Sequence, residues 1–343
     1  MDRVHVPEWL SALVDDLAAE VRKVVAPKLG EVAAKGLAGR AEGGDTTFSI
    51  DVLAEDRVSA FLEERGEPVA LYSEDQGLLA YDHAAAPEFV LVVDPIDGTR
   101  PAAAGFEAAC VSVAAAVLAG DDVVSASPRM RDVVYGVVQE IKEGGVFRAG
   151  RGLGVEALDS EGRARPLAPS VSEDLSRLFW ALGFRGRPAR ELTAVLGDLI
   201  DLSSVDGGVF DLGSATYCMT RILTGQLDCF IDPGPRMIEV APWVEERFRQ
   251  VGKGAVLNNA PYDVAASTLI LEEAGCPVTD TTGRSLHDRP LLGAGRDYQM
   301  AVVASANEPL HQLVLAEIDR GLKAFSLGGP AGGRPGTREG ART

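Results

Sequence analysis

The segment DPIDGT at residues 94–99 constrains this chain most, because it sets two carboxylates directly after an apolar strand. FVLVV at 89–93 is apolar on both faces and predicts a buried strand that ends at Asp94. A proline then fixes the chain direction and Gly98 permits a tight turn, so the side chains of Asp94 and Asp97 can converge. Two carboxylates at a buried strand end repel each other and resist loss of water.

Two interpretations of this pair are open from the residues alone. A bound hard cation would remove both penalties, and oxygen-only ligands favour Mg²⁺ over zinc. Alternatively, the two aspartates cap the segment that follows. Glu74 likewise follows an apolar run, PVALYS at 68–73. Twenty residues separate it from Asp94, which is enough for a loop and a return to a neighbouring strand. Asp263 lies in the first turn of the helix expected after Pro261, where an acid also complements the helix dipole.

Hydrophobic periodicity predicts a mixture of helices and strands along the chain. Helices are predicted at 9–25, 52–64, 192–202, 213–223, 262–275 and 309–322, and strands at 68–72, 89–93, 110–118, 133–138, 227–232 and 301–305. Residues 150–175 are rich in Gly, Arg, Ser and Pro, which predicts a seam between two halves of the chain. We therefore expect a first half at 1–155 that carries the acidic strands, a second half at 170–325, and a disordered low-complexity tail at 328–343.

Charge and composition exclude several classes of function. A net charge of −18 argues against a nucleic-acid-binding surface, and no run approaches the roughly 18 apolar residues of a membrane span. The N-terminus lacks the basic start and apolar run of a signal peptide. The four cysteines form no CxxC pair and stand among apolar residues, which indicates buried free thiols in a reducing compartment. These features predict a cytoplasmic protein with no nucleic-acid or membrane partner.

Three segments in this order resemble the inositol monophosphatase family of metal-dependent phosphatases. They are SEDQG at 73–77, DPIDGT at 94–99 and YDVAASTLILEEAG at 262–275, and the similarity extends from about Leu10 to about Leu322. The resemblance implies an α/β (α+β) layered sandwich with alternating helix and sheet layers. It also implies a homodimer that acts on a small phosphorylated metabolite with two or three Mg²⁺ ions.

Carried onto this sequence, the resemblance implies that Glu74, Asp94 and the carbonyl of Ile96 hold one Mg²⁺. Asp94, Asp97 and Asp263 would hold a second, and Glu74 would assist a third.

The catalytic residues that the resemblance implies are Thr99, Asp51 and Glu74. Thr99 would bind the attacking water with the support of Asp51; the alternative is that both residues only cap nearby helices. The substrate-binding residues that it implies are Gly98, Thr99, Gly213, Ser214, Ala215 and Asp232.

The chain departs from the family pattern in three places. Arg100 and Pro101 follow DGT where the family usually has Asn and an aromatic residue. Tyr262 and Ser267 replace a Trp and a Gly. About thirty residues, mainly 233–261, separate Asp232 from Asp263, and their mixed charges predict one solvated helix face. We expect this insertion to shape substrate access or a dimer interface and not to bind metal.

The expected function is Mg²⁺-dependent hydrolysis of a small phosphate monoester, such as inositol 1-phosphate or a related sugar or cyclitol phosphate, by a metal-activated water. Fructose 1,6-bisphosphate is an alternative substrate, and so is another phosphate or diphosphate metabolite of a biosynthetic pathway. A non-catalytic metal-binding regulator is the alternative from another class. The complete ligand set, together with Thr99 and Asp51, argues against it.

Overall fold

The computed structural model describes residues 6–80, 86–119 and 123–328. The predicted disordered tail lies, beyond Gly328, outside the described residues. The helices are α1 (Glu8–Val25), α2 (Ser49–Arg65), α3 (Thr99–Ala104), α4 (Val123–Ala126), α5 (Ala189–Ser203), α6 (Ala215–Leu223), α7 (Gly234–Val240), α8 (Glu245–Val251), α9 (Pro261–Glu273) and α10 (Glu308–Leu327).

The strands of the described residues form three sheets. They are β1 (Leu37–Arg40), β2 (Thr46–Phe48), β3 (Val69–Ser73), β4 (Gly77–Ala80), β5 (Phe89–Asp97), β6 (Cys110–Val117), β7 (Val133–Glu140), β8 (Val146–Gly150), β9 (Gly154–Leu158), β10 (Phe179–Leu182), β11 (Gly208–Phe210), β12 (Cys229–Asp232), β13 (Val278–Thr279) and β14 (Val302–Ser305). The larger sheets have the orders β4-β3-β5-β6-β7-β8-β9 and β11-β10-β12-β14-β13, and β1 pairs with β2.

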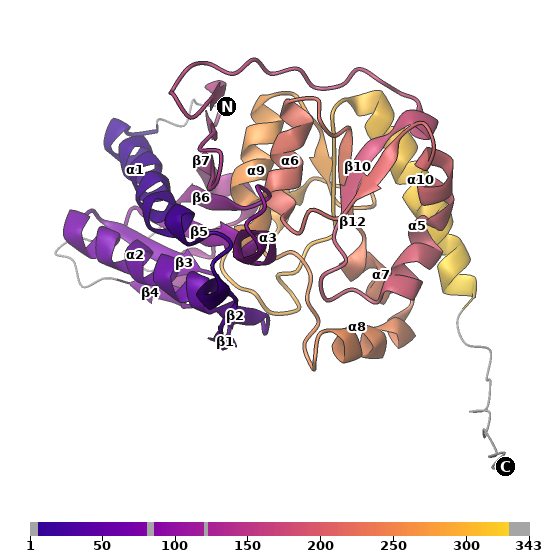
Figure 1. Ribbon diagram of the computed structural model, residues 1–343, viewed down its shortest axis with the longest axis horizontal. Helices are drawn as coiled ribbons and strands as arrows, with labels where there is room; N and C mark the ends of the chain where they lie inside the picture. The colour runs from indigo at the N-terminus through magenta and orange to yellow at the C-terminus, as the bar shows by residue number, and fades with distance from the viewer. Residues whose placement is uncertain (1–5, 81–85, 120–122, 329–343) are drawn as a thin grey trace, which may run out of the picture.

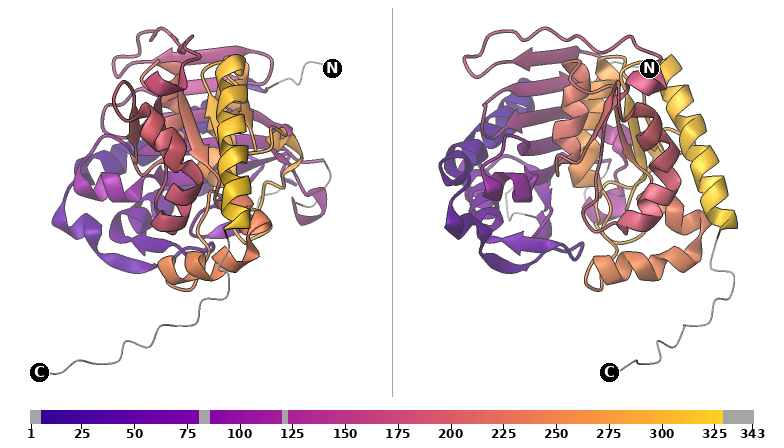
Figure 2. Two further views of the ribbon diagram at one scale, coloured as in Figure 1. Left: turned by 90° about the vertical axis from the view of Figure 1, so that its right-hand side faces the viewer. Right: turned by 45° about the vertical axis from the view of Figure 1, so that its right-hand side comes forward.

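Helix and sheet layers alternate across the molecule, as Figures 1 and 2 show. The apolar faces of α1 and α2 pack on one side of the seven-stranded sheet. The helices α6 and α9 lie between the two large sheets, and α5 and α10 cover the outer side of the five-stranded sheet. The predicted layered α/β sandwich is therefore confirmed.

The position of each helix follows from its apolar pattern. Leu10, Leu13, Leu17 and Val21 recur at helical spacing and are fully buried, so α1 covers a sheet with one face and meets water with the other. In α9, every residue from Pro261 to Leu271 is buried. A helix without a solvent-exposed face lies inside the protein, and α9 does so because it separates two sheets.

Strand register brings the acidic strand ends together. Strand β3 pairs in parallel with β5, and Ser73 lies opposite Val93, so Glu74 and Asp94 leave the sheet at the same edge. The prediction that the strand ends at Asp94 was wrong, because β5 continues to Asp97. Its pairing with β6 shifts register between Asp94 and Asp97, and this bulge accommodates a proline that cannot donate a ladder hydrogen bond.

The structure adds detail to two other sequence predictions. The segment at 150–175 begins with β9, which pairs with β8 and extends the seven-stranded sheet to Leu158, and the division of the chain into two halves stays a prediction. The insertion does not form one helix face, because a break after Val240 divides it into α7 and α8, and Phe248 and Met237 turn inward. Within the described ranges, no helix is both long and apolar enough to cross a membrane.

Candidate active site and metal centre

Three buried carboxylates converge where β5, α6 and α9 meet. One oxygen atom from each of Asp94, Asp97 and Asp263 lies within 4.8 Å of the others. These residues are at most 5% exposed. The structure therefore gathers three of the predicted metal ligands around one point, although they are up to 169 positions apart in the sequence.

Hydrogen bonds from backbone amides and from one hydroxyl fix the orientation of each carboxylate. The amide of Ile96 donates to Asp94 Oδ1 at 3.0 Å, across the bulge in β5. Asp97 Oδ2 accepts from Ser214 Oγ at 2.8 Å and from the amide of Thr216 at 2.6 Å, at the start of α6. Asp263 Oδ2 accepts from the Ala260 amide at 2.6 Å and thereby caps α9. The capping interpretation of Asp263 is thus correct for one oxygen of its carboxylate.

The protein compensates the negative charges of these carboxylates only in part. Burial, with repulsion from Glu74 and Asp97, raises the pKa of Asp94 well above its ordinary value. Burial raises the pKa of Asp263 to about 7, although the Arg185 guanidinium acts in the opposite direction. A divalent cation would supply the missing positive charge, and three carboxylates offer the hard oxygen donors that Mg²⁺ prefers. The residues present therefore fit the metal that the resemblance implies.

Glu74 lies beside this group and not within it. It follows directly after β3 and is partly buried, and it is not one of the three carboxylates that share the 4.8 Å limit. Its charge raises the pKa of Asp94, and burial together with repulsion from Asp263 raises its own pKa. The carbonyl of Ile96 accepts a hydrogen bond from the Thr99 hydroxyl at 3.2 Å. Both residues are thus next to the cluster, and their roles as ligands stay predictions.

Asp51 combines a structural contact with a position near Thr99. Its Oδ2 accepts from the Phe48 amide at 2.7 Å, so it does cap α2 as the alternative interpretation requires. Burial raises the pKa of Asp51 to about 7, while hydrogen bonds from Phe48 and from Thr99 act to lower it. A carboxylate with this pKa next to a hydroxyl can accept a proton near neutral pH. Capping and proton transfer are therefore compatible at this residue.

The glycines predicted to face the substrate occupy turns that need them. Gly98 has φ +98°, and a Cβ there would lie 2.4 Å from the Ala108 carbonyl oxygen. Gly213 has φ +76° and lies against the ring of Pro101. Ser214 caps α6 by accepting from the Tyr217 amide at 3.0 Å while it donates to Asp97. The turn after β5 and the start of α6 are consequently packed against each other.

Asp232, which the resemblance implies to bind substrate, is occupied by contacts within the protein. It is 1% exposed and forms a buried ion pair with Arg187. It also accepts from Asn259 Nδ2 at 2.8 Å and from the Gly234 amide at 3.0 Å. Its proposed contact with substrate hydroxyls stays a prediction, and its evident role is to hold Arg187.

A basic cluster next to the carboxylates was not predicted from the sequence. Asp45 pairs with Arg185 at 2.8 Å and with Arg100 at 3.1 Å. Burial acts to raise the pKa of Asp45, but the two guanidinium groups outweigh it and hold this pKa below the ordinary value. Arg185 belongs to the segment GFRGRP, directly after β10. The pattern that could have predicted this cluster is a pair of arginines between glycines and a proline, directly after a strand.

A small cavity and a larger pocket lie next to the carboxylates and share part of their lining. A cavity of about 30 Å³ is lined by Asp97, Asp263, Arg185, Asp211 and Gly213, among others. The last three of these residues also line a pocket of about 510 Å³. The larger volume is within the range of small-molecule binding sites.

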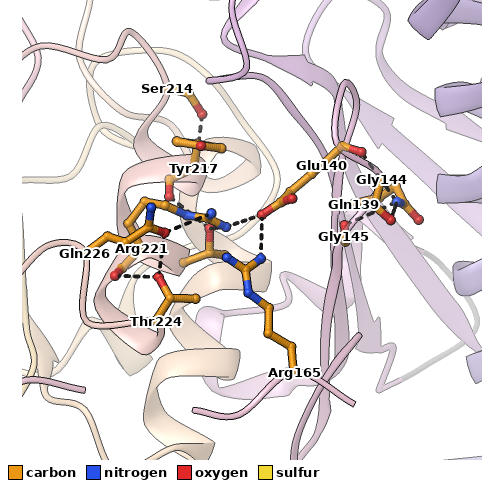
Figure 3. A network of polar contacts seen from close by, with 11 residues as sticks. Gln139, Glu140, Gly144, Gly145, Arg165, Ser214, Tyr217, Arg221, Thr224 and Gln226 are labelled. Carbon is orange, nitrogen blue, oxygen red and sulfur yellow. Dashed lines mark hydrogen bonds and ion pairs between the residues drawn. The ribbon is translucent and has the colours of Figure 1, made fainter. Parts of the chain in front are cut away.

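Polar contacts also hold the C-terminal end of helix α6 in place, as Figure 3 shows. Arg221 forms a buried ion pair with Glu140 of β7, and Arg165 reaches the same carboxylate oxygen at 3.3 Å. Arg221 Nη1 also donates to Gln226 at 3.2 Å. Since Ser214 begins the same helix and binds Asp97, this network fixes the position of a residue that orients the carboxylate cluster.

Comparison with known proteins agrees with this geometry. The sequence profile described as the inositol monophosphatase family matches residues 8–322. A protein of Mycobacterium leprae named inositol-1-monophosphatase is 30% identical over 334 residues, which cover 92% of this chain and 94% of the relative. A protein of Methanothermobacter thermautotrophicus named fructose-1,6-bisphosphatase/inositol-1-monophosphatase is 27% identical, over 93% of this chain and 99% of its own length.

Among solved structures, the inositol monophosphatase from Anabaena (Nostoc) superposes with a TM-score of 0.62 at 20% identity. The match covers 91% of this chain and 96% of that one, and shows that the two share a fold. The profile match over nearly all of the described residues, together with the relative at 30% identity, shows the family. This chain belongs to the inositol monophosphatase family of phosphatases.

Proposed function

We propose that this phosphatase hydrolyses a small phosphate monoester, inositol 1-phosphate or a related sugar or cyclitol phosphate, in a reaction that depends on Mg²⁺. The observation that carries the proposal is the convergence of Asp94, Asp97 and Asp263 within 4.8 Å. The name of the M. leprae relative, inositol-1-monophosphatase, supports the substrate class.

The proposed metal site uses Glu74, Asp94, Asp97, Asp263 and the Ile96 carbonyl to hold two or three Mg²⁺ ions. When bound, the ions would lower the pKa of a water molecule and stabilise negative charge on the leaving oxygen. The convergent oxygen donors and the raised pKa values of Asp94 and Asp263 support this assignment.

In the proposed reaction, the chain's own groups position the water and the phosphate. Thr99 orients the water through its hydroxyl, and Asp51 accepts the proton, which its pKa of about 7 favours. The amides of Gly98 and Thr99 bind phosphate oxygens in the turn after β5. Ser214 keeps the Asp97 carboxylate in place by its 2.8 Å hydrogen bond.

Fructose 1,6-bisphosphate is the second candidate substrate. The relative from M. thermautotrophicus is named for both activities, and this supports testing both esters on this chain. A homodimer and a cytoplasmic location also stay proposals; the four cysteines are free and buried, as a reducing compartment would allow.

Phosphate release from a panel of esters tests the proposal. Purified protein is stripped of metal with EDTA and assayed with inositol 1-phosphate, fructose 1-phosphate, fructose 1,6-bisphosphate and inorganic diphosphate, with and without Mg²⁺. We expect release from the first three esters only when Mg²⁺ is present. Hydrolysis of diphosphate alone would replace the proposed substrate class, and no release from any compound would refute the proposal.

A further inference from the structure

The pocket of about 510 Å³ beside the carboxylates has an unusual charge for this protein. Four cationic side chains line it, those of Arg40, Arg100, Arg185 and Lys253, and two acidic ones, those of Asp45 and Asp211. Four cations and two acids leave a net charge of +2, although the chain as a whole carries −18. Such a local reversal of sign attracts an anion and repels a cation.

Arg40 and Lys253 are the cations that remain available in this pocket. Arg100 and Arg185 share Asp45 as their partner. In contrast, Arg40 and Lys253 form no ion pair with a carboxylate of the described residues. Arg40 instead donates to the carbonyl of Gly44 at 3.2 Å and to that of Lys253 at 3.5 Å. These contacts join β1 to the insertion at one wall of the pocket.

The backbone of the insertion holds Lys253 in a conformation that a lysine rarely adopts. Its φ is +54°, between Gly252 and Gly254, whereas most non-glycine residues avoid the left-handed region. Val251, Gly252 and Leu257 line the same pocket, so the insertion contributes directly to its wall. The turn therefore presents a cation at the edge of a hollow that leads to the carboxylate cluster.

The pocket and the carboxylates belong to one continuous surface. Arg185, Asp211 and Gly213 line both the pocket and the small cavity that Asp97 and Asp263 also line. A ligand with one phosphate at the carboxylate cluster can thus extend past Gly213 into the pocket. A volume of about 510 Å³ accommodates the body of a sugar-sized molecule and a second charged group.

We propose that Arg40 and Lys253, in the pocket that Arg100 also lines, bind a second phosphate group on the substrate, so that the enzyme prefers bisphosphorylated to monophosphorylated esters. This inference rests on the proposed phosphatase activity and names the substrate class that the site selects. Both residues act on affinity and not on the chemical step, because they line the pocket and not the cavity with Asp97 and Asp263.

The test compares fructose 1,6-bisphosphate with fructose 1-phosphate, which differ only in the second phosphate. Lys253→Asn removes the charge and inserts a residue that tolerates positive φ, and Arg40→Gln removes the other cation. Each variant is expected to lower kcat/KM for the bisphosphate by roughly tenfold, through KM, and to change kcat/KM for the monophosphate less than twofold. Arg40→Lys retains the charge and should keep most of the preference. Lys23→Asn, on the exposed side of α1, removes a charge elsewhere and should change neither ester.

The outcomes separate this inference from the proposed function. Equal losses for both esters, or a wild-type enzyme that prefers the monophosphate, would overturn the second phosphate site while leaving the phosphatase activity in place. Absence of phosphate release from both fructose esters, with Mg²⁺ present and inositol 1-phosphate still hydrolysed, would overturn this inference alone. Absence of release from inositol 1-phosphate as well would overturn the proposed function. The preference for the bisphosphate should also weaken as salt is raised, because the two cations are exposed to solvent.

Discussion

Replacing Asp94 by Asn tests the electrostatic description of the site. The side chains have nearly the same shape, and Asn retains an oxygen that can accept from the Ile96 amide. The change removes one negative charge from a buried group that also contains Asp97 and Asp263. We therefore expect the metal-free variant to be more stable than the wild-type protein at pH 8 and to lose phosphatase activity.

The magnitude follows from the spacing of the carboxylates. Two unit charges 4.8 Å apart repel each other by about 3.5 kcal/mol at an effective dielectric constant of roughly 20. Because the raised pKa values of Asp94 and Asp263 mean that these acids are partly protonated, the expected gain in free energy of unfolding is smaller, about 1–3 kcal/mol. For a chain of this length the increase in Tm is roughly 1.5–4 °C.

Thermal unfolding in EDTA at pH 8 and pH 5, with and without added Mg²⁺, measures this effect. The gain should fall at pH 5, where the wild-type acids are protonated, and Mg²⁺ should stabilise the wild-type protein more than the variant. Asp56→Asn, at an exposed position of α2, is the matched control and should have little effect. A lower Tm for metal-free Asp94→Asn, or near-normal Mg²⁺-dependent turnover, would refute the reasoning.

Three further predictions concern the proton acceptor, the pH dependence of stability and the support of α6. Thr99→Ala and Asp51→Asn should each lower kcat by roughly 10²–10⁴-fold with little change in KM, and their effects should combine less than additively; fully additive losses, or a lower Tm with kcat preserved, would leave only the capping role. The metal-free protein should become less stable as pH rises from about 4 to 7, because Asp51 and Glu55 have folded-state pKa values of about 7, above their ordinary values, so the folded state holds more protons in this interval. Stability in EDTA that rises between pH 5 and pH 7 would contradict this. Glu140→Gln leaves the buried Arg221 without its carboxylate and should cost about 3–5 kcal/mol in free energy of unfolding, measured by urea denaturation. A cost below about 1 kcal/mol would show that Arg221, which also contacts Gln226, does not need the carboxylate of Glu140 to hold α6 in place.

The sequence predicted best where periodicity and burial act together. The helix at 9–25 and the strand at 89–93 follow from apolar spacing that has only one stable solution, burial against a sheet or inside it. The meeting of Asp94 with Asp97 could be inferred because the two residues are only three positions apart, although they lie in the bulged end of β5 and not in a turn. Asp263 joined them only through the resemblance, since no local pattern relates α9 to β5.

What the sequence did not predict depends on long-range packing. The extension of β5 through Pro95 depends on its pairing with β6, and no residue of β5 itself predicts that pairing. The division of the insertion into two helices is decided by the burial of Phe248 and Met237 against the rest of the chain. Likewise, the ion pair of Asp232 with Arg187 joins residues 45 positions apart, and neither residue is unusual in its own segment.

The dependence of phosphate release on free Mg²⁺, measured for the wild-type protein and for Asp263→Asn, tests the central claim most directly. The substitution keeps an acceptor for the Ala260 amide and so preserves the cap of α9 while removing one carboxylate from the cluster. We predict that metal-stripped wild-type protein is inactive on inositol 1-phosphate and regains activity as Mg²⁺ is added, and that the variant stays nearly inactive while its circular dichroism is unchanged. Full phosphate release in EDTA, or an identical Mg²⁺ dependence in the two proteins, would contradict the claim that Asp94, Asp97 and Asp263 form the metal centre of a phosphatase.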